Sequence, residues 1–263
     1  MEEREKRLIA RLHGKDLKDV RYAVREAAES GNRACISALI ELLERSLGDY
    51  ERRSLASAVI EALGKLGARE AEPVLFKALE SKIYFIKGEA AEALGKVGPS
   101  DEALEEMKEV ISEDVPKEVK KDAIRGLAEA GGRKAVRHLV DVAGSQQDWE
   151  LKQGALEAVP EADGDEAAYP LMEFYRTEAD GKIKTDVINA LARIGSVGAL
   201  DFLLDALADS SPEVRSCAAL ALGEIGKPEA EAPLRRLLGD PSEVVRKSAA
   251  KALGLVKFLP SDA

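Results

Sequence analysis

The sequence predicts an all-α solenoid of about eight two-helix repeats, and three observations lead to this prediction. A segment that ends in glycine recurs along the chain, and its clearest copies read EVRSCAALALGEIG at 213–226 and FIKGEAAEALGKVG at 85–98. Successive copies end 31 to 35 residues apart, and a fixed period of this size is typical of solenoids. Aromatic residues make up only 4% of the chain, so the core must be built from Ala, Leu, Val and Ile, which suits closely packed helices.

The last residue of each copy is its anchor, and it marks the end of a helix. Most anchors are glycine, and the substitutes Asn and Asp also tolerate the left-handed backbone that ends a helix. The eight anchors are Asn32, Gly67, Gly98, Gly131, Asp163, Gly195, Gly226 and Lys257. They define repeats at about 2–32, 33–67, 68–98, 99–131, 132–163, 164–195, 196–226 and 227–257, with a C-terminal tail at 258–263. No linker is long enough to divide this array, so we expect a single domain over 1–263.

Each repeat is expected to hold two helices, A and B, joined by a short turn. In the last two repeats helix A is predicted at 197–208 and 229–239, and the turn that follows begins at Asp209 or Asp240. These aspartates are candidate N-caps for helix B, and Pro212 lies near its first turn. The turns therefore carry signals that start a helix.

Aligned on their anchors, the B helices share one apolar face. The residue twelve positions before the anchor is always Val, Ile or Leu, and the residue five positions before it is always Ala or Gly. These offsets fall on the same side of an α-helix. The column of small residues predicts that the backbones of neighbouring B helices lie close together, because larger side chains would hold them apart.

A basic residue recurs eleven positions before the anchor in every repeat except the second, where Ala56 replaces it. The members of this basic ladder are Arg21, Lys87, Lys120, Lys152, Lys184, Arg215 and Arg246. One interpretation is a stripe that binds anions. The interpretation we favour is structural: each cation caps or pairs across the A–B turn of its own or the next repeat.

The pattern EVRxxAAxALGxxG, with an Asp-Pro turn before it, resembles the HEAT-repeat family. More narrowly it resembles the short HEAT-like repeats named after phycobilisome (PBS) bilin lyases, and the resemblance covers about 2–257. It implies a right-handed α-α superhelix with the B helices on the concave side and the A helices on the convex side. HEAT-like deoxyhypusine hydroxylases hold iron with His-Glu pairs, whereas here His13 is followed by Gly14 and His138 by Leu139.

No constellation of catalytic residues stands out. The two histidines lack the paired spacing of a metal site, and the glycines occur at helix ends rather than in a phosphate-binding loop. We therefore expect a non-enzymatic protein without catalytic residues, metal or cofactor. The net charge of −10 argues against nucleic acid as a partner, because binding phosphates requires clustered Lys and Arg.

The chain is also expected to be cytoplasmic and to bind no membrane. No apolar run approaches the length of a membrane span, and the charged N-terminal residues do not resemble a signal peptide. The two cysteines, Cys35 and Cys217, lie in different repeats and suggest no disulfide framework.

Aromatic residues at the predicted rim of A–B turns indicate a protein partner. Tyr84 and Trp149 share the position fourteen before the anchor, Lys117 holds that position in the repeat between them, and Phe85 adjoins Tyr84. Tyr22 and Tyr50 lie near the same rim. Exposed Tyr and Trp among polar neighbours are frequent anchors of interfaces. The alternative is that each ring packs over its own A–B turn.

Three apolar residues stand at concave positions that other repeats fill with polar residues: Leu220, Val244 and Leu255. Either the C-terminal tail or a partner would cover them. The sequence therefore predicts a scaffold that binds another protein through Tyr84, Phe85, Lys117, Trp149, Leu220, Val244 and Leu255. The alternatives are an accessory subunit of a modifying enzyme, such as a bilin lyase, and a HEAT-like nucleic-acid enzyme.

Overall fold

The computed structural model describes residues 2–145, 148–162, 164–195 and 197–256, and in these residues all regular secondary structure is helical. The helices form consecutive A–B pairs, as the sequence predicts. The chain divides into two compact units, unit 1 (residues 1–142) and unit 2 (residues 143–263), and each is described by itself.

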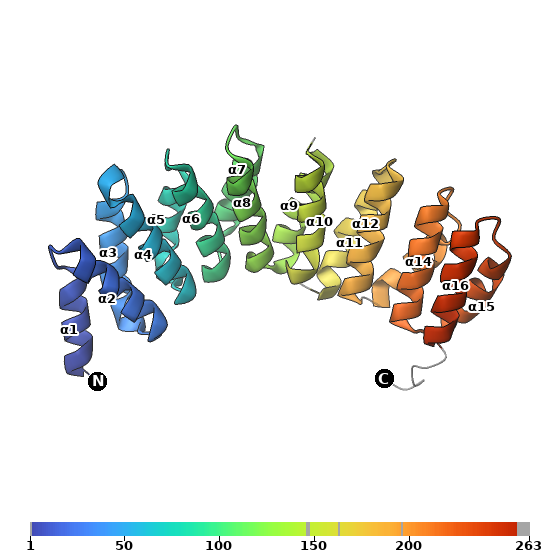
Figure 1. The fold of residues 1–263 in the computed structure, drawn as a ribbon, viewed down its shortest axis with the longest axis horizontal. Helices are drawn as coiled ribbons and strands as arrows, with labels where there is room; N and C mark the ends of the chain where they lie inside the picture. The colour runs from blue at the N-terminus through green and yellow to red at the C-terminus, as the bar shows by residue number, and fades with distance from the viewer. Residues whose placement is uncertain (1, 146–147, 163, 196, 257–263) are drawn as a thin grey trace. The chain divides into compact units, whose positions relative to one another are not determined.

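Unit 1 contains four complete pairs of helices (Figure 1). The A helices are α1 (Glu2–Leu12), α3 (Ile36–Ser46), α5 (Glu72–Leu79) and α7 (Asp101–Ser112). The B helices are α2 (Leu17–Glu29), α4 (Arg53–Lys65), α6 (Tyr84–Val97) and α8 (Lys117–Ala130). Short 3₁₀ turns precede α3, α4 and α5: η1 (Arg33–Cys35), η2 (Tyr50–Arg52) and η3 (Arg69–Ala71). Helix α9 (Gly132–Ser145) contains the boundary between the units.

Unit 2 continues the same order. Its A helices are α11 (Gly164–Thr177), α13 (Leu200–Ala206) and α15 (Glu231–Arg236), and its B helices are α10 (Trp149–Ala162), α12 (Gly181–Ile194), α14 (Pro212–Ile225) and α16 (Glu243–Val256). The predicted A helices at 197–208 and 229–239 are shorter than expected. They are interrupted by the 3₁₀ turns η4 (Val197–Ala199), η5 (Pro228–Ala230) and η6 (Leu237–Gly239). Such tightened turns satisfy backbone groups at helix ends.

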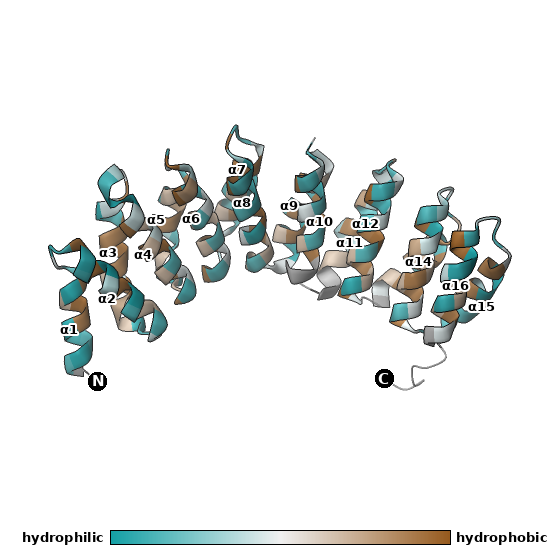
Figure 2. Ribbon diagram, in the orientation of Figure 1, coloured by the Kyte–Doolittle hydropathy of each residue, from teal (hydrophilic) through white to brown (hydrophobic). Residues whose placement is uncertain are grey.

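In each unit the helices form two layers, and apolar stripes face the space between them (Figure 2). Within a unit, B helices pack against the A helix of their own repeat and the B helix of the next, as α6 does with α5 and α8. The within-pair turns of unit 1 lie along the upper edge of Figure 1 because successive helices run antiparallel. Residues at the start of the B helices are thereby brought to one edge of unit 1, which is called the rim below.

Neighbouring B helices approach so closely that small residues are required between them, as predicted. A Cβ added to Gly126 would overlap the carbonyl oxygen of Ala91 and lie 2.6 Å from Cε of Met107. A Cβ on Gly95 would overlap the backbone of Gly126 in turn. The α6–α8 contact is therefore made by backbone against backbone.

The left-handed helix end is confirmed at Gly67, Gly98, Gly131, Gly195 and Gly226, all of which have positive φ. The prediction for Asn32 is wrong, because Gly31 takes the left-handed conformation (φ 63°) while Asn32 is extended and caps η1. Gly31 lacks the Cβ that makes this conformation costly. The two remaining anchors, Asp163 and Lys257, and the tail lie outside the described residues.

In the turn before α14, the predicted aspartate Asp209 is not the N-cap of the B helix. Ser211 caps α14 by accepting a hydrogen bond from the backbone N–H of Val214, and Asp209 accepts instead from the N–H of Ser211. The same turn recurs where Asp240 accepts from the N–H of Ser242. The aspartate side chains thus stabilise the turn itself.

Replacing Gly126 by Ala is expected to lower the free energy of unfolding by about 1–3 kcal/mol, because the added methyl group overpacks the α6–α8 contact. Gly154→Ala is the matched control, since a Cβ there meets nothing within 4 Å and helix propensity favours Ala. Urea titrations followed by circular dichroism would compare the two. An equal effect of both substitutions would contradict the close contact.

Candidate functional site

At several positions the basic ladder joins one repeat to the next beside the A–B turns. Arg215 donates hydrogen bonds from Nε and Nη2 to the two carboxylate oxygens of Asp240, each at 2.9 Å. Its Nη1 donates to the carbonyl oxygens of Asp209 and Ser210 in the turn of its own repeat. Both side chains of the Arg215–Asp240 pair are largely buried. The guanidinium therefore caps one turn and pairs with the carboxylate of the next.

The same arrangement occurs at other ladder positions. Nζ of Lys87 lies 2.8 Å from a carboxylate oxygen of Glu113, and Nζ of Lys184 lies 3.0 Å from Oδ2 of Asp209. Arg246 donates to carbonyl oxygens of its own turn. At these positions the structural interpretation of the ladder is confirmed, and their charges are already used within the fold.

Tyr175 reinforces the Lys184–Asp209 pair. Its hydroxyl donates to Oδ2 of Asp209 at 2.8 Å, and its ring makes an edge contact with Phe202, with ring centroids 4.8 Å apart. Burial alone would raise the pKa of Asp209, but hydrogen bonds from Ser211, Lys184 and Tyr175 bring this pKa below its ordinary value. The carboxylate therefore stays ionised.

The predicted interface residues of unit 1 lie on the surface at the rim. Tyr84 and Phe85 begin α6 and are 50% and 42% exposed. Lys117 is also exposed and begins α8. The neighbouring rings of Tyr84 and Phe85 form the start of an apolar surface that water does not favour.

Trp149 lies in unit 2 as the first residue of α10, and it is only partly exposed. The ammonium group of Lys182 lies 3.7 Å from the centroid of its ring, which is a cation–π contact between neighbouring repeats. One face of the indole is thus already used inside unit 2, unlike the rings of Tyr84 and Phe85.

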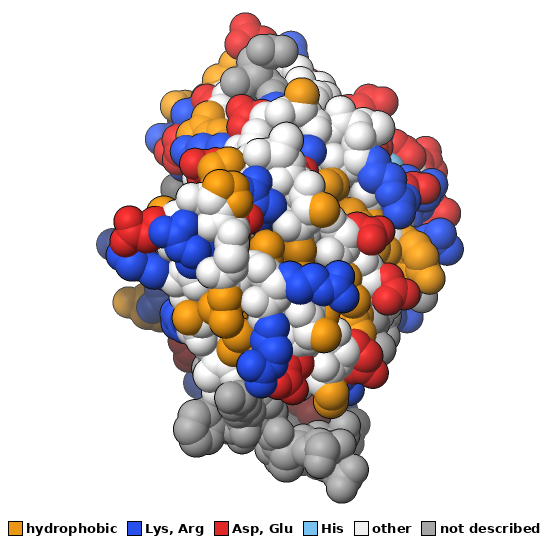
Figure 3. All heavy atoms as spheres, turned by 90° about the vertical axis from the view of Figure 1, so that its right-hand side faces the viewer, with side chains coloured by type: hydrophobic (Ala, Val, Ile, Leu, Met, Phe, Trp, Pro, Cys, Tyr) orange, Lys and Arg blue, Asp and Glu red, His pale blue; other side chains and the backbone are white. Residues whose placement is uncertain are grey.

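The three residues of the predicted apolar patch in unit 2 do not form one continuous apolar surface among the described side chains. Leu220 is partly buried on α14, Val244 is 61% exposed on α16, and the side chain of Leu255 lies outside the described residues. Leu220 lies six residues before its anchor, whereas Val244 lies thirteen residues before its own. The two side chains therefore stand at heights on their helices that differ by about 10 Å. Figure 3, which looks on to the α15–α16 end, shows small hydrophobic groups separated by charged side chains.

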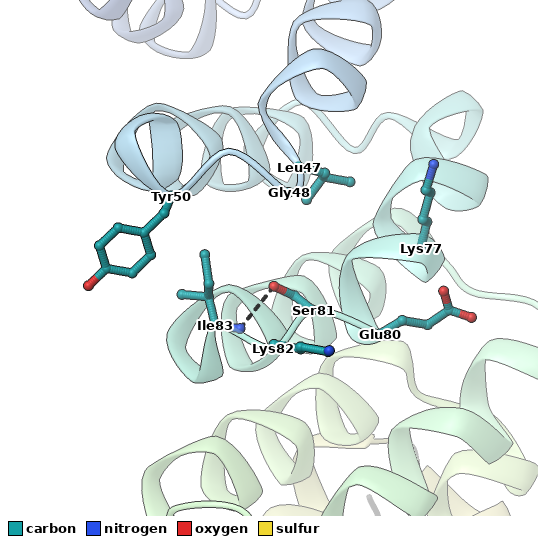
Figure 4. A pocket seen from close by; sticks show the side chains of 8 residues that line it. All are labelled: Leu47, Gly48, Tyr50, Lys77, Glu80, Ser81, Lys82 and Ile83. Carbon is teal, nitrogen blue, oxygen red and sulfur yellow. Dashed lines mark hydrogen bonds between the residues drawn. The ribbon is translucent and has the colours of Figure 1, made fainter.

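Two tyrosines that the predicted site omits are the most exposed aromatic residues of unit 1. Tyr22 on α2 is 67% exposed and Tyr50 in η2 is 65% exposed. Tyr22 lines a hollow of about 360 Å³, and Tyr50 lines another of about 440 Å³ between the second and third A–B turns (Figure 4). Their position near the rim was visible in the sequence, but nothing there separated them from rings that pack locally.

Buried polar groups in unit 1 offer no clear reactive centre. Ser57 donates to Glu89 at 2.8 Å, and burial raises the pKa of Glu89. His138 is buried on α9, where burial lowers its pKa, so its imidazole is neutral beside Glu105 at neutral pH. In unit 2, burial raises the pKa of Cys217 to about 11, which leaves it a thiol. Across the described part of the chain, no three His, Cys, Asp or Glu side chains are grouped to hold a metal ion.

Comparison with known families shows that the chain belongs to the HEAT-repeat family. The family model described as HEAT repeats matches residues 49–128, 104–192 and 200–261, which is most of the chain. The more specific resemblance to repeats named after bilin lyases agrees with the paired helices and glycine ends described above. No curated protein sequence matches the chain.

Several solved structures are similar. Kap121p is 15% identical with a TM-score of 0.58, and the alignment covers 97% of this chain but 33% of Kap121p. The CpcE–CpcF complex of phycocyanin lyase from Nostoc sp. PCC7120 is 19% identical (TM-score 0.49; 97% and 94% covered). Human deoxyhypusine hydroxylase is 22% identical (TM-score 0.43; 98% and 97% covered). At these identities the likeness to Kap121p establishes a shared solenoid fold. In the described part of this chain, no helix has the length and apolar character needed to cross a membrane.

Arg215→Ala is expected to lower the melting temperature by about 4 °C, because it leaves the carboxylate of Asp240 and two turn carbonyls without their donor. Arg215→Lys should recover only part of this loss, since an ammonium group cannot form two parallel bonds to a carboxylate. Arg236→Ala, an exposed arginine on α15, is the control and should change the melting temperature by less than about 1 °C. Equal effects of Arg215→Ala and Arg236→Ala would contradict the role of the ladder.

Stability is expected to fall as the pH drops below 6.5, the ordinary pKa of histidine, partly because of His138. Its pKa is lower in the folded chain, so unfolding takes up a proton and acid favours the unfolded state. Melting temperatures at about pH 7.5 and about pH 5.5 would show a smaller decrease for His138→Leu than for the natural chain. A decrease unaffected by His138→Leu would refute the assignment.

Proposed function

We propose that this chain is a non-enzymatic scaffold that binds another protein along the rim of A–B turns and the outer face of its B helices. The outer face is the one that points away from the A helices, and the sequence predicts it to be concave. The observation that carries the proposal is the pair of exposed rings at the start of α6, Tyr84 and Phe85. Among the described residues neither ring has an aromatic partner, and the hydroxyl of Tyr84 makes no hydrogen bond. Burying one such ring at an interface is worth about 1.5–3 kcal/mol.

The architecture supports this proposal. The apolar columns pack between the helices, and the paired ladder cations bind the A–B turns. The outer face of the B helices and the rim are left for a ligand. Solenoids use such extended surfaces to bind partners. A solved structure of Kap121p, whose fold this chain shares, is of a complex with Pho4p. A protein partner is therefore the class of ligand that the fold and the exposed rings favour together.

Tyr84→Ala is expected to weaken binding of the partner at least about tenfold, because interface aromatics contribute a large share of affinity. Trp149→Ala should weaken it as well. The partner would be captured on the immobilised chain, identified by mass spectrometry, purified, and measured by calorimetry.

Tyr169→Ala is the control, since Tyr169 is 65% exposed on α11 and belongs to no predicted site. Circular dichroism should show the same helicity for all three variants. Unchanged affinity in both Tyr84→Ala and Trp149→Ala would disprove the assigned interface, and so would loss of folding in both.

A further inference from the structure

Exposed aromatic rings are concentrated at one edge of unit 1. Its three tyrosines are Tyr22, Tyr50 and Tyr84, and each is at least half exposed. Tyr22 lies on α2, and Tyr50 lies in η2, which leads into α4; α2 and α4 pack against each other. The first two repeats therefore present two rings on neighbouring elements.

The hollow beside Tyr22 is lined by three cations: Lys18, Arg21 and Arg25. Among the described residues none of them has a carboxylate within ion-pair distance. The nearby acidic residues are already engaged, since Asp16 caps α2 and Arg11 holds both Asp19 and Glu26.

Arg21 is a predicted ladder residue, and here the prediction that it caps or pairs is wrong. Val20 is buried like the other residues twelve positions before the anchor, so Arg21 does lie at the ladder position of α2. Arg21 is turned outward and is exposed. It caps no turn and pairs with no carboxylate of the next repeat, in contrast to Arg215.

The three cations lie on one side of α2 at spacings of three and four residues, where like charges repel each other and destabilise a helix. This cluster also occurs in a chain whose net charge is −10. Carboxylates placed between the cations would remove the repulsion. Guanidinium groups such as those of Arg21 and Arg25 bind carboxylates through two parallel hydrogen bonds.

The second repeat extends the same surface. The guanidinium of Arg53 lies 3.9 Å from the centroid of the Tyr50 ring and donates to the carbonyl oxygen of Tyr50. Lys77 and Lys82 line the hollow beside Tyr50, together with Glu80 (Figure 4). Cationic groups thus alternate with exposed rings from α2 to the third A–B turn. We call the surface formed by Lys18, Arg21, Tyr22, Arg25, Tyr50 and Arg53 the cationic edge.

We propose that the cationic edge binds a short acidic peptide segment of the partner protein, an inference that rests on the proposed function. Its carboxylates contact Lys18, Arg21 and Arg25, and an apolar side chain of the segment packs on Tyr22 and Tyr50. Tyrosine and arginine are the residue types most enriched where interface energy is concentrated. The cations determine that the segment is acidic, and the rings determine that it also carries an apolar residue.

Nucleic acid would also contact cations and stack on tyrosines, but the surroundings disfavour a long polyanion. Glu51 and Glu80 lie within the same edge, and Glu61 and Glu92 follow on the outer faces of α4 and α6. A phosphate backbone would pass over these carboxylates, whereas a short peptide can place its charges only on α2. The net charge of −10 opposes a polyanion over longer distances as well.

The test measures fluorescence anisotropy of a labelled peptide of alternating glutamate and phenylalanine with the full chain at near-physiological salt. We expect saturable binding that the double substitution Arg21→Glu with Arg25→Glu weakens at least about tenfold. Tyr22→Ala should weaken it about fivefold, and Tyr22→Phe should have little effect because the ring remains. Arg133→Glu with Arg137→Glu is the matched control, because it makes the same charge change at exposed arginines of α9. The control should change affinity by less than about twofold.

Two further probes separate the alternatives. The same peptide with lysine in place of glutamate should not bind. Labelled oligothymidylate should bind more weakly than the glutamate peptide, and tighter binding would overturn the proposal in favour of nucleic acid. Equal losses from the Arg21/Arg25 and Arg133/Arg137 double substitutions would overturn it too, because the effect would then reflect net charge alone.

The two experiments can fail independently, so a failure of the cationic edge can be told from a failure of the proposed function. If a partner is captured through Tyr84 and Trp149 but the glutamate peptide does not bind, the cationic edge is refuted and the scaffold stands. If the glutamate peptide binds through Arg21 and Arg25 while Tyr84→Ala and Trp149→Ala leave capture unchanged, the interface on α6 and α10 is refuted and the cationic edge stands.

Discussion

The fold depends on the close approach of successive B helices. At Gly95 and Gly126 there is no space for even one methyl group, and Gly223 meets the backbone of Ala252 in the same way in unit 2. Small residues bring the helices near enough for many weak dispersion contacts, which together are large. This close contact fixes the spacing of the repeats, and the spacing in turn decides which side chains can reach from one A–B turn to the next.

The ladder shows that the most regular feature of a repeat need not be its binding site. A cation in all but one of the periods suggests a stripe for anions, yet Arg215, Lys184 and Lys87 are paired with carboxylates of the following turn. Arg21, in contrast, lies at the ladder position but is exposed and makes no ion pair among the described residues. In a repeat protein, departures from the consensus are therefore more informative about ligands than the consensus itself.

Much of the fold could be predicted because it depends on residue size and period alone. The paired helices, the column of small residues and the role of the ladder follow from such patterns. The choice of Gly31 over Asn32 could not, since adjacent residues compete for the left-handed position. The cap at Ser211 could not either, since Asp and Ser are both favoured as N-caps and both stand in this turn. The lysine over Trp149 comes from the next repeat, so only packing in three dimensions reveals this cation–π contact. Among the described residues, the ring of Tyr84 has no such contact.

The bonds of Arg215 give the array a direction. Its guanidinium holds the turn behind it through carbonyl oxygens and the turn ahead through a carboxylate, so this junction has a donor side and an acceptor side. Because both side chains of the Arg215–Asp240 pair are largely buried, dissolved salt screens their charges only weakly. The helix contact beside this pair is apolar and is not screened at all. A junction of this kind is therefore held by two contacts whose strength changes little with ionic strength.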